Sequence, residues 1–118
     1  MVVLFSITQY INSSKDTSIR GNLSILASSG EVYYNNYGDT YDGFCDSAPV
    51  ENAFLQMPHI AGGESYCADG QNEWAACSRL FIDNRIAYCV DSRGVQREIC
   101  NDSCDSFTIV CPDLGSCN

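Results

Sequence analysis

Residues 16–38, DTSIRGNLSILASSGEVYYNNYG, carry apolar or small side chains at intervals of three and four positions. The repeating positions are Ile19, Leu23, Leu26, Gly30, Tyr33 and Tyr37. Because an α-helix completes a turn in about 3.6 residues, this spacing places all of them on one helical face. We expect that face to pack against a sheet, with Gly30 allowing a close approach of the two.

The same helix is predicted to extend towards the N-terminus, where Leu4, Ile7 and Ile11 form a similar stripe and no proline interrupts residues 2–36. About 35 residues at 1.5 Å each give a rod of about 50 Å, which is longer than a small domain needs. Some of its apolar surface must therefore meet something outside the domain. The Asn and Gly residues of positions 33–39 are suited to end the helix.

The chain, 118 residues long, fits one domain with two parts. We expect an N-terminal helix over residues 1–37 and a globular head over residues 38–118. Within the helix, residues 1–15 are predicted to serve assembly and residues 16–37 to pack on the head.

Cysteine is confined to the head. The first 44 residues contain none, and the remainder contains all eight: Cys45, Cys67, Cys77, Cys89, Cys100, Cys104, Cys111 and Cys117. An even count at irregular spacing in a small chain predicts disulfide bonds and an oxidising compartment. Sequence alone leaves roughly a hundred pairings open. Proximity suggests only that the last four cysteines pair partly among themselves.

Metal binding is the competing interpretation of these residues. Zinc sites use paired Cys-x₂₋₄-Cys knuckles or nearby histidines, whereas only Cys100 and Cys104 approach that spacing and the sole histidine, His59, is far away.

Acidic turns could supply oxygen ligands to calcium. The candidate turns contain Asp39, Asp42 and Asp46, then Asp69, Asn72 and Glu73, then Asp102 and Asp105. Their turn-forming propensity explains them without a metal, so we expect no cofactor, with calcium as the alternative.

The head is predicted to contain an antiparallel meander. Its β-prone runs, separated by Asp, Asn, Ser and Gly turns, are residues 86–90, 95–100 and 107–111. A hairpin turn is expected over residues 91–94, and residues 73–80 fit either a helical turn or a first strand. Residues 45–72 are expected to be irregular apart from a short helix over residues 50–56. The fold class is therefore α+β, a long helix on a small sheet stapled by disulfides.

The charge pattern excludes one class of partner. Six basic residues against fifteen acidic ones give a formal net charge of −9. This is the opposite of the basic footprint of a nucleic-acid-binding protein. No apolar run is long enough to span a bilayer, and residues 1–5 do not form a signal peptide. We expect export information to lie upstream and Met1 to be an introduced start.

Catalytic signatures are missing from the sequence. His59 has no evident partner for acid–base chemistry, no serine lies in a Gly-x-Ser-x-Gly elbow, and no glycine run resembles a phosphate loop. The aromatic group Tyr33, Tyr34, Tyr37, Tyr41 and Phe44 could form a ligand surface, but a core seam between helix and sheet is the favoured interpretation. We expect the protein not to be an enzyme.

Several segments resemble bacterial type IV pilins and pseudopilins. The run Val2-Val3-Leu4, residues 15–23 (KDTSIRGNL) and residues 31–38 (EVYYNNYG) are similar to the first helix of that family. There, a basic-acidic step precedes an Asn-Leu helical face, and a Glu-apolar-Tyr-Tyr segment closes the helix. Segments 43–45 (GFC), 73–76 (EWAA) and 88–94 (YCVDSRG) resemble the later parts of pilins with disulfide-rich heads. The four-cysteine tail resembles the family's variable, disulfide-closed region.

The resemblance implies a ladle-shaped subunit of an extracellular filament used for adhesion, surface motility or uptake. Its partners would be copies of itself and the pilus assembly machinery, and the inner membrane would hold it before assembly. The filament core would contain Val2, Val3, Leu4, Phe5, Ile7, Tyr10 and Ile11. The family's prepilin cleavage site, methylatable first residue, nearby glutamate and first half of the apolar helix have no counterpart here, as expected of a truncated chain.

Three other functions compete with this one. A pseudopilin of a type II-like secretion system would share the fold, and a calcium site in the head would favour it. A secreted, disulfide-rich binding module would use its helix to form a discrete complex. A small secreted hydrolase would require His59 to lie beside a carboxylate or serine in a cleft.

Overall fold

The computed structural model describes residues 2–58 and 65–117, with side chains described from residue 7 onward. It has an α+β fold, as predicted. The helices are α1 (Val2–Asn36) and α2 (Ala48–Gln56). The strands are β1 (Ser65–Asp69), β2 (Trp74–Arg79), β3 (Ile86–Asp91) and β4 (Gln96–Cys100). They form one antiparallel sheet in the order β1-β2-β3-β4.

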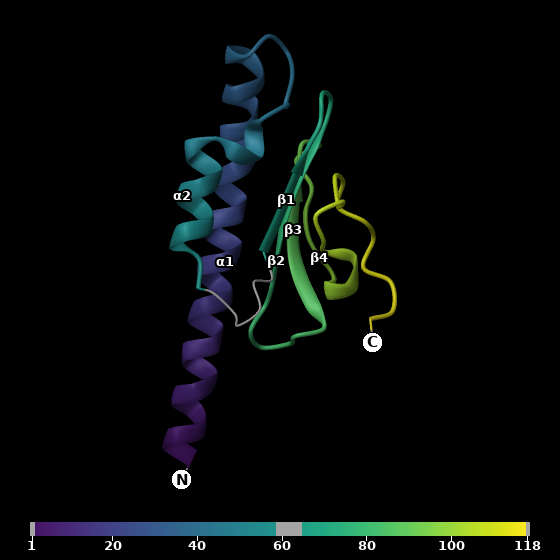
Figure 1. Cartoon of the computed structure of the whole chain (residues 1–118). Coiled ribbons are helices and arrows are strands. Elements are labelled where there is room, and N and C mark those ends of the chain that lie inside the picture. The colour runs from purple at the N-terminus through teal and green to yellow at the C-terminus, as the bar shows by residue number, and fades with distance from the viewer. Residues whose placement is uncertain (1, 59–64, 118) are drawn as a thin grey trace.

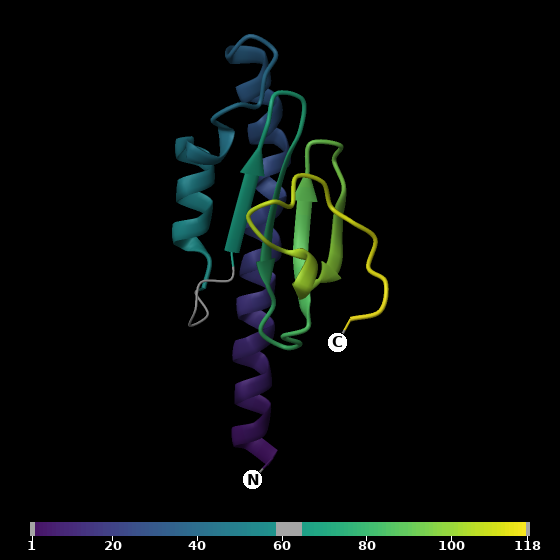
Figure 2. The ribbon, with the colours of Figure 1, turned by 45° about the vertical axis from the view of Figure 1, so that its right-hand side comes forward.

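Three layers build the head. Both helices lie on one face of the sheet, and the C-terminal segment that follows β4 crosses the other face (Figures 1 and 2). Short 3₁₀ turns, η1 (Phe44–Asp46) and η2 (Asn101–Ser103), lead into α2 and out of β4. The described molecule measures 57 × 29 × 23 Å, and α1 sets its long dimension.

The helix-facing core confirms most of the predicted packing face. Ile19, Leu23 and Leu26 are fully buried, because neighbouring turns of α1 direct them at the sheet. Their partners are Phe44, Val50, Ala53, Met57, Trp74, Ala76, Leu80 and Val90. Burying such side chains contributes about 1.5–3 kcal/mol each relative to leaving them in water. This cluster fixes the angle at which α1 leaves the head.

Gly30 is the point of closest approach between α1 and the sheet. A β-carbon there would lie 2.6 Å from Nε1 of Trp74 and 3.0 Å from its Cε2. No real side chain fits at that distance, so the glycine is required by the fully buried indole. The prediction that Gly30 allows close packing of helix on sheet is confirmed.

The second core lies on the opposite face of the sheet. Successive residues of a strand point to opposite faces, so Cys77 and Cys89, which are direct partners across β2 and β3, point away from the helices. They form disulfides with Cys104 and Cys111 of the C-terminal segment. The segment is therefore tied down over the sheet at two adjacent points.

All eight cysteines are paired, and no free thiol remains. The other two bonds join Cys45 to Cys67 and Cys100 to Cys117. The prediction that the last four cysteines pair partly among themselves is confirmed by Cys100–Cys117. Cys104 and Cys111 instead bond back to the sheet, which sequence proximity did not indicate.

Two segments differ from their predicted structure. Residues 65–69, expected to be irregular, form β1, because the short segment is stabilised by its ladder with β2. Residues 107–111, expected to be a strand, belong to no strand, because the disulfides at Cys104 and Cys111 hold the segment over the sheet face and not in its plane. Residues 73–80 contain β2, which settles the choice between turn and strand.

Tyr37 departs from the predicted packing face. Helix α1 ends at Asn36, and the next residues turn through Gly38 (φ 76) and Asp39 (φ 63), both left-handed. Tyr37 is consequently exposed and stacks on Tyr33 with ring centroids 4.3 Å apart. The rest of the aromatic group behaves as a core seam, since Tyr33 and Tyr41 pack against the cluster around Phe44.

Asp91 locks the hairpin after β3 to the C-terminal segment. Its carboxylate is 1% exposed and accepts hydrogen bonds from the Arg93 side chain and from the backbone N–H groups of Arg93 and Cys111. Burial raises the pKa of Asp91, but the Arg93 and backbone hydrogen bonds outweigh it and lower that pKa below its ordinary value. The carboxylate is therefore ionised in the folded protein at neutral pH.

Candidate assembly surface

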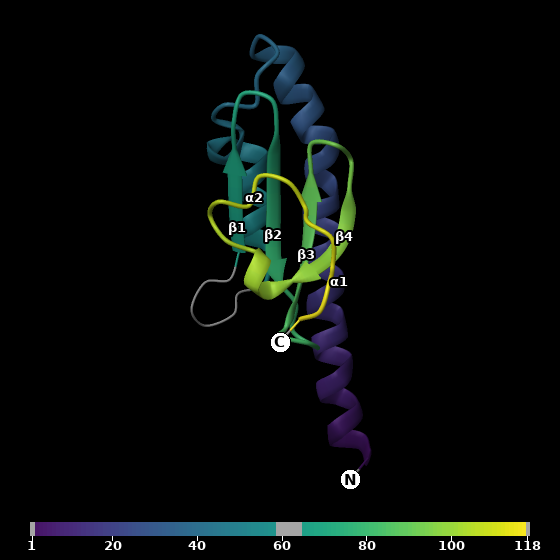
Figure 3. The same cartoon turned by 90° about the vertical axis from the view of Figure 1, so that its right-hand side faces the viewer.

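The N-terminal part of α1 projects beyond the head. Figure 3 and both other views show it extending past the ends of all four strands with no other element beside it. Ile7, Tyr10 and Ile11 are all exposed there, Tyr10 by 73%. The side chains of Val2, Val3, Leu4 and Phe5 lie outside the described residues, so their predicted role stays a prediction. The structure brings the described members of the predicted filament core together on one projecting rod.

An uncharged stripe continues from this rod along the head-level part of α1 as far as Ser28. Its members, spaced three or four residues apart, are Ile7, Ile11, Ser14, Ser18, Gly21, Ile25 and Ser28, and we call them the outer stripe. Six are exposed and Ser18 is half-buried. This spacing, repeated over successive turns, is that of a helix seam that packs against another helix. Ile25, 62% exposed in the middle of the head, has no role in the subunit's own core.

Gly21 stands out within the outer stripe. A glycine inside a helix costs about 1 kcal/mol relative to alanine, and Gly30 has a packing reason for that cost. At Gly21 an added β-carbon would meet nothing within 4 Å. The small residues at positions 14, 18 and 21 leave the helix surface flat between Ile11 and Ile25, so that a second helix could approach closely.

Sequence reasoning missed the second half of this stripe. It identified Ile7 and Ile11 as a similar stripe nearer the N-terminus but did not extend that stripe to Ile25, with which they align on the exposed side. The missed signal was the seven-residue spacing of Ile11, Ser18 and Ile25, because residues seven apart lie almost in line along a helix.

The head fixes the projecting rod at the level of residues 15–20. Asp16 is buried, and its carboxylate accepts hydrogen bonds from the backbone N–H groups of Phe81 (2.6 Å) and Ile82 (3.2 Å). Lys15 lies over the Phe81 ring, 4.7 Å from its centroid. These contacts attach α1 to the loop between β2 and β3 at the point where the helix leaves the head.

Two ion pairs lie near that attachment, one between α1 and the sheet and one within the loop. Arg20 pairs with Glu98 of β4 at 3.0 Å and lies over the Tyr88 ring. In the loop after β2, hydrogen bonds from Arg85 lower the pKa of Asp83. Both pairs are largely exposed, so each contributes little on its own. Arg20, like Asp16 and Lys15, therefore contacts the head and is not part of the outer stripe.

The remaining candidate sites from the sequence are His59 and the acidic turns. His59 lies outside the described residues, and the hydrolase hypothesis that needs it stays untested. Within the described ranges, no three His, Cys, Asp or Glu side chains are grouped to hold a metal ion. Two of the acidic turns instead cap backbone N–H groups: Asp69 accepts from Cys45 and Asp105 accepts from Phe107.

The chain matches no family model, no characterised protein and no solved structure. Among the described residues, no helix combines the length and apolarity needed to cross a membrane. The function must therefore be inferred from the residues themselves.

Proposed function

We propose that this protein is a structural subunit of an extracellular, type IV pilin-like filament, and that it assembles through α1. The observation that supports this proposal is the outer stripe, an uncharged face of a helix that is longer than its head, of which every member but Ser18 is exposed in the subunit. A pilus subunit and a pseudopilin would share this arrangement.

Burial of the stripe supplies the energy for association. Apolar surface removed from water contributes about 25 cal/mol per Å², and Ile7, Ile11 and Ile25 offer such surface at two levels of the helix. A copy that packs its rod against the head-level half of the next copy makes a head-to-tail contact. Repetition of such a contact without closure gives an open helical filament.

The head has the properties of an exposed domain. Its four disulfides indicate an extracellular or secreted protein. Most of the acidic residues lie in the head, where mutual repulsion would keep neighbouring heads soluble and apart.

Sedimentation velocity of the purified chain at rising concentration, with electron microscopy of the same samples, tests the proposal. An open polymer would grow continuously with concentration and form thread-like particles. A single complex of fixed stoichiometry, or a monomer at every concentration, would instead favour a secreted binding module whose helix docks on another protein.

A further inference from the structure

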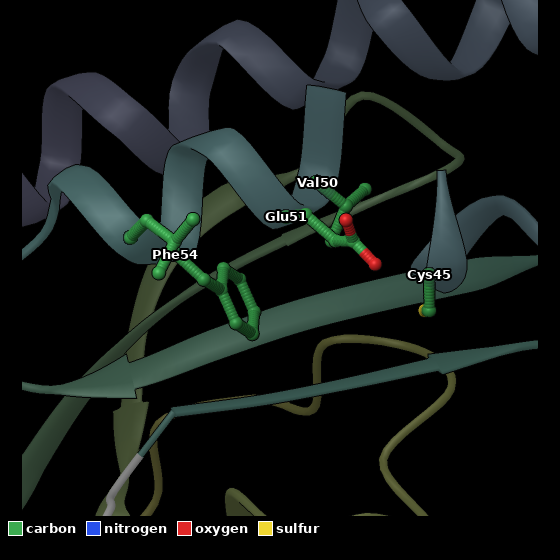
Figure 4. A pocket seen from close by; sticks show the side chains of 5 residues that line it. Cys45, Val50, Glu51 and Phe54 are labelled. Atoms are coloured by element: carbon green, nitrogen blue, oxygen red, sulfur yellow. The ribbon is translucent and has the colours of Figure 1, made fainter. Parts of the chain in front are cut away.

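A pocket of about 310 Å³ opens beneath α2. Its lining is Cys45, Val50, Glu51, Phe54 and Leu55, so it is apolar except for one carboxylate. Figure 4 shows Phe54 directed from α2 towards the strands below and Glu51 extending from α2 on the side of Cys45. Leu55 is 75% exposed, although α2 packs its opposite face into the core through Val50 and Ala53.

The pocket adjoins one edge of the sheet. Cys45, at its end, is bonded to Cys67 in the middle of β1, and β1 is a terminal strand of the four. In the described part of the chain, no strand pairs with the outer edge of β1. Every second residue of an edge strand directs its N–H and C=O groups away from the sheet, so this edge presents unpaired backbone groups next to an apolar pocket.

The two edge strands of the sheet, β1 and β4, differ in how their outer edges are protected. At β4, Arg97 bonds to Asp113 and the carbonyl of Pro112, Glu98 pairs with Arg20, and Cys100 is tied to the tail through Cys117. Charged side chains and covering segments of this kind are how proteins prevent strand addition. Strand β1 contains no Lys, Arg or Pro, and its one acidic residue, Asp69, is engaged with the N–H group of Cys45.

We propose that β1 and the pocket beneath α2 bind an extended peptide segment of a partner protein, which adds to the sheet as a fifth strand. The peptide backbone would bond to the outer edge of β1, and one apolar side chain would enter the pocket. This combination, in which backbone bonds give affinity and a pocket gives specificity, is a general mode of peptide recognition. The site is separate from the outer stripe and goes beyond the filament function.

The acidic residues around the pocket favour a peptide that carries basic side chains. Glu51 is the only charged residue in the lining and is exposed, and Asp46 beside Cys45 is exposed as well. Glu51 and Phe54 are one turn apart on α2, about 5 Å along the axis, and alternate side chains of a strand are about 7 Å apart. A basic side chain two residues from the apolar one would therefore reach Glu51. A second copy of this chain, with its net charge of −9, is a poor occupant.

Fluorescence anisotropy with a labelled, end-capped peptide of sequence Arg-Thr-Leu-Thr-Val-Thr-Arg tests the proposal. Its arginines, leucine and valine share one strand face. We expect saturable binding that weakens at least tenfold when Leu55→Asp or Glu51→Gln is introduced at low salt. Leu114→Ala, at an exposed leucine in the tail segment that Cys117 ties to β4, is the matched control and should bind as the wild type does.

Two further modifications of the peptide distinguish strand addition from non-specific binding. Only every second backbone amide of an added strand faces β1. Of two versions of the peptide, each with N-methyl groups on one of the two alternate sets of amides, one should therefore lose binding, and a version with glutamates in place of the arginines should bind at least tenfold more weakly. Absence of saturable binding, or affinity equal to that of the unmodified peptide for both N-methylated versions or for Leu55→Asp, would overturn the proposal. Ile25→Asp, which tests the filament function, should leave peptide binding unchanged.

Discussion

Gly30 of α1 and Trp74 of β2 share a space that only one of them can fill. The position that a β-carbon would take on Gly30 is 2.6 Å from Nε1 of the indole, and Trp74 is itself fully buried between the helix and the sheet. The close approach of α1 to the sheet at this point therefore depends on the absence of a side chain at position 30.

Gly30→Ala is expected to lower the free energy of unfolding by about 1–3 kcal/mol, because the methyl group forces the helix away from a close-packed indole. Gly21→Ala is the matched control, since an added β-carbon there meets nothing within 4 Å. It should raise stability by up to about 1 kcal/mol through helix propensity. Urea unfolding monitored by Trp74 fluorescence measures both. Equal effects of the two substitutions would contradict the close packing.

The Asp91 carboxylate should make the fold sensitive to acid. Its pKa is lower in the folded state than in the unfolded chain, so its contribution is complete above about pH 4 and is lost as pH falls through the folded pKa. Asp91→Asn should destabilise the protein by about 2–3 kcal/mol at pH 7. The variant should also lose less stability than wild type between pH 5 and pH 2. Parallel pH profiles in thermal melts would argue against this assignment.

Asp16 is predicted to hold the loop between β2 and β3 on the helix. Asp16→Ala removes the acceptor of two backbone N–H groups and should cost about 1–3 kcal/mol. Hydrogen exchange should accelerate at Phe81 and Ile82. Glu31→Ala, an exposed acidic residue on the same helix, is the control. If the amides of Phe81 and Ile82 exchange at wild-type rates in Asp16→Ala, the attachment lies elsewhere.

Removal of the Cys89–Cys111 bond by paired substitution with serine should destabilise the head by about 3 kcal/mol, since the bond closes a loop with a sequence separation of 22. The C-terminal segment should become the first site of proteolysis.

Peptide mapping of the wild type without reduction should recover four disulfide bonds with the connectivity found here. A Cys104–Cys111 peptide would contradict the way in which the segment crosses the sheet.

Much of the fold could be predicted, because the signal was periodic. The three- and four-residue spacing of Ile19, Leu23 and Leu26 identified the buried face of α1, and the turn residues before Val95 located the hairpin. Strand β1 was missed because its sequence, Ser-Tyr-Cys-Ala-Asp, has little apolar alternation and depends on pairing with β2. The disulfides that join Cys77 and Cys89 to the tail could not be predicted from the sequence either, because they depend on which face of the sheet each cysteine occupies.

The candidate sites were predictable to different degrees. Exposed apolar residues at Ile7 and Ile11 follow from a helix longer than its domain, whereas the continuation of the stripe to Ile25 required knowing which face the sheet covers. The pocket beneath α2 could not be anticipated, because it arises from the packing of Phe54 and Leu55 beside an edge strand that the sequence did not reveal.

The most direct test of the assembly surface is a comparison of two charge substitutions by sedimentation velocity. Ile25→Asp places a carboxylate in the outer stripe at an exposed position, and Phe107→Asp places one at an exposed apolar residue on the far side of the sheet. Both variants should fold as the wild type does. We predict that Ile25→Asp abolishes concentration-dependent growth and Phe107→Asp preserves it. Growth that survives Ile25→Asp unchanged would contradict assembly through the outer face of α1.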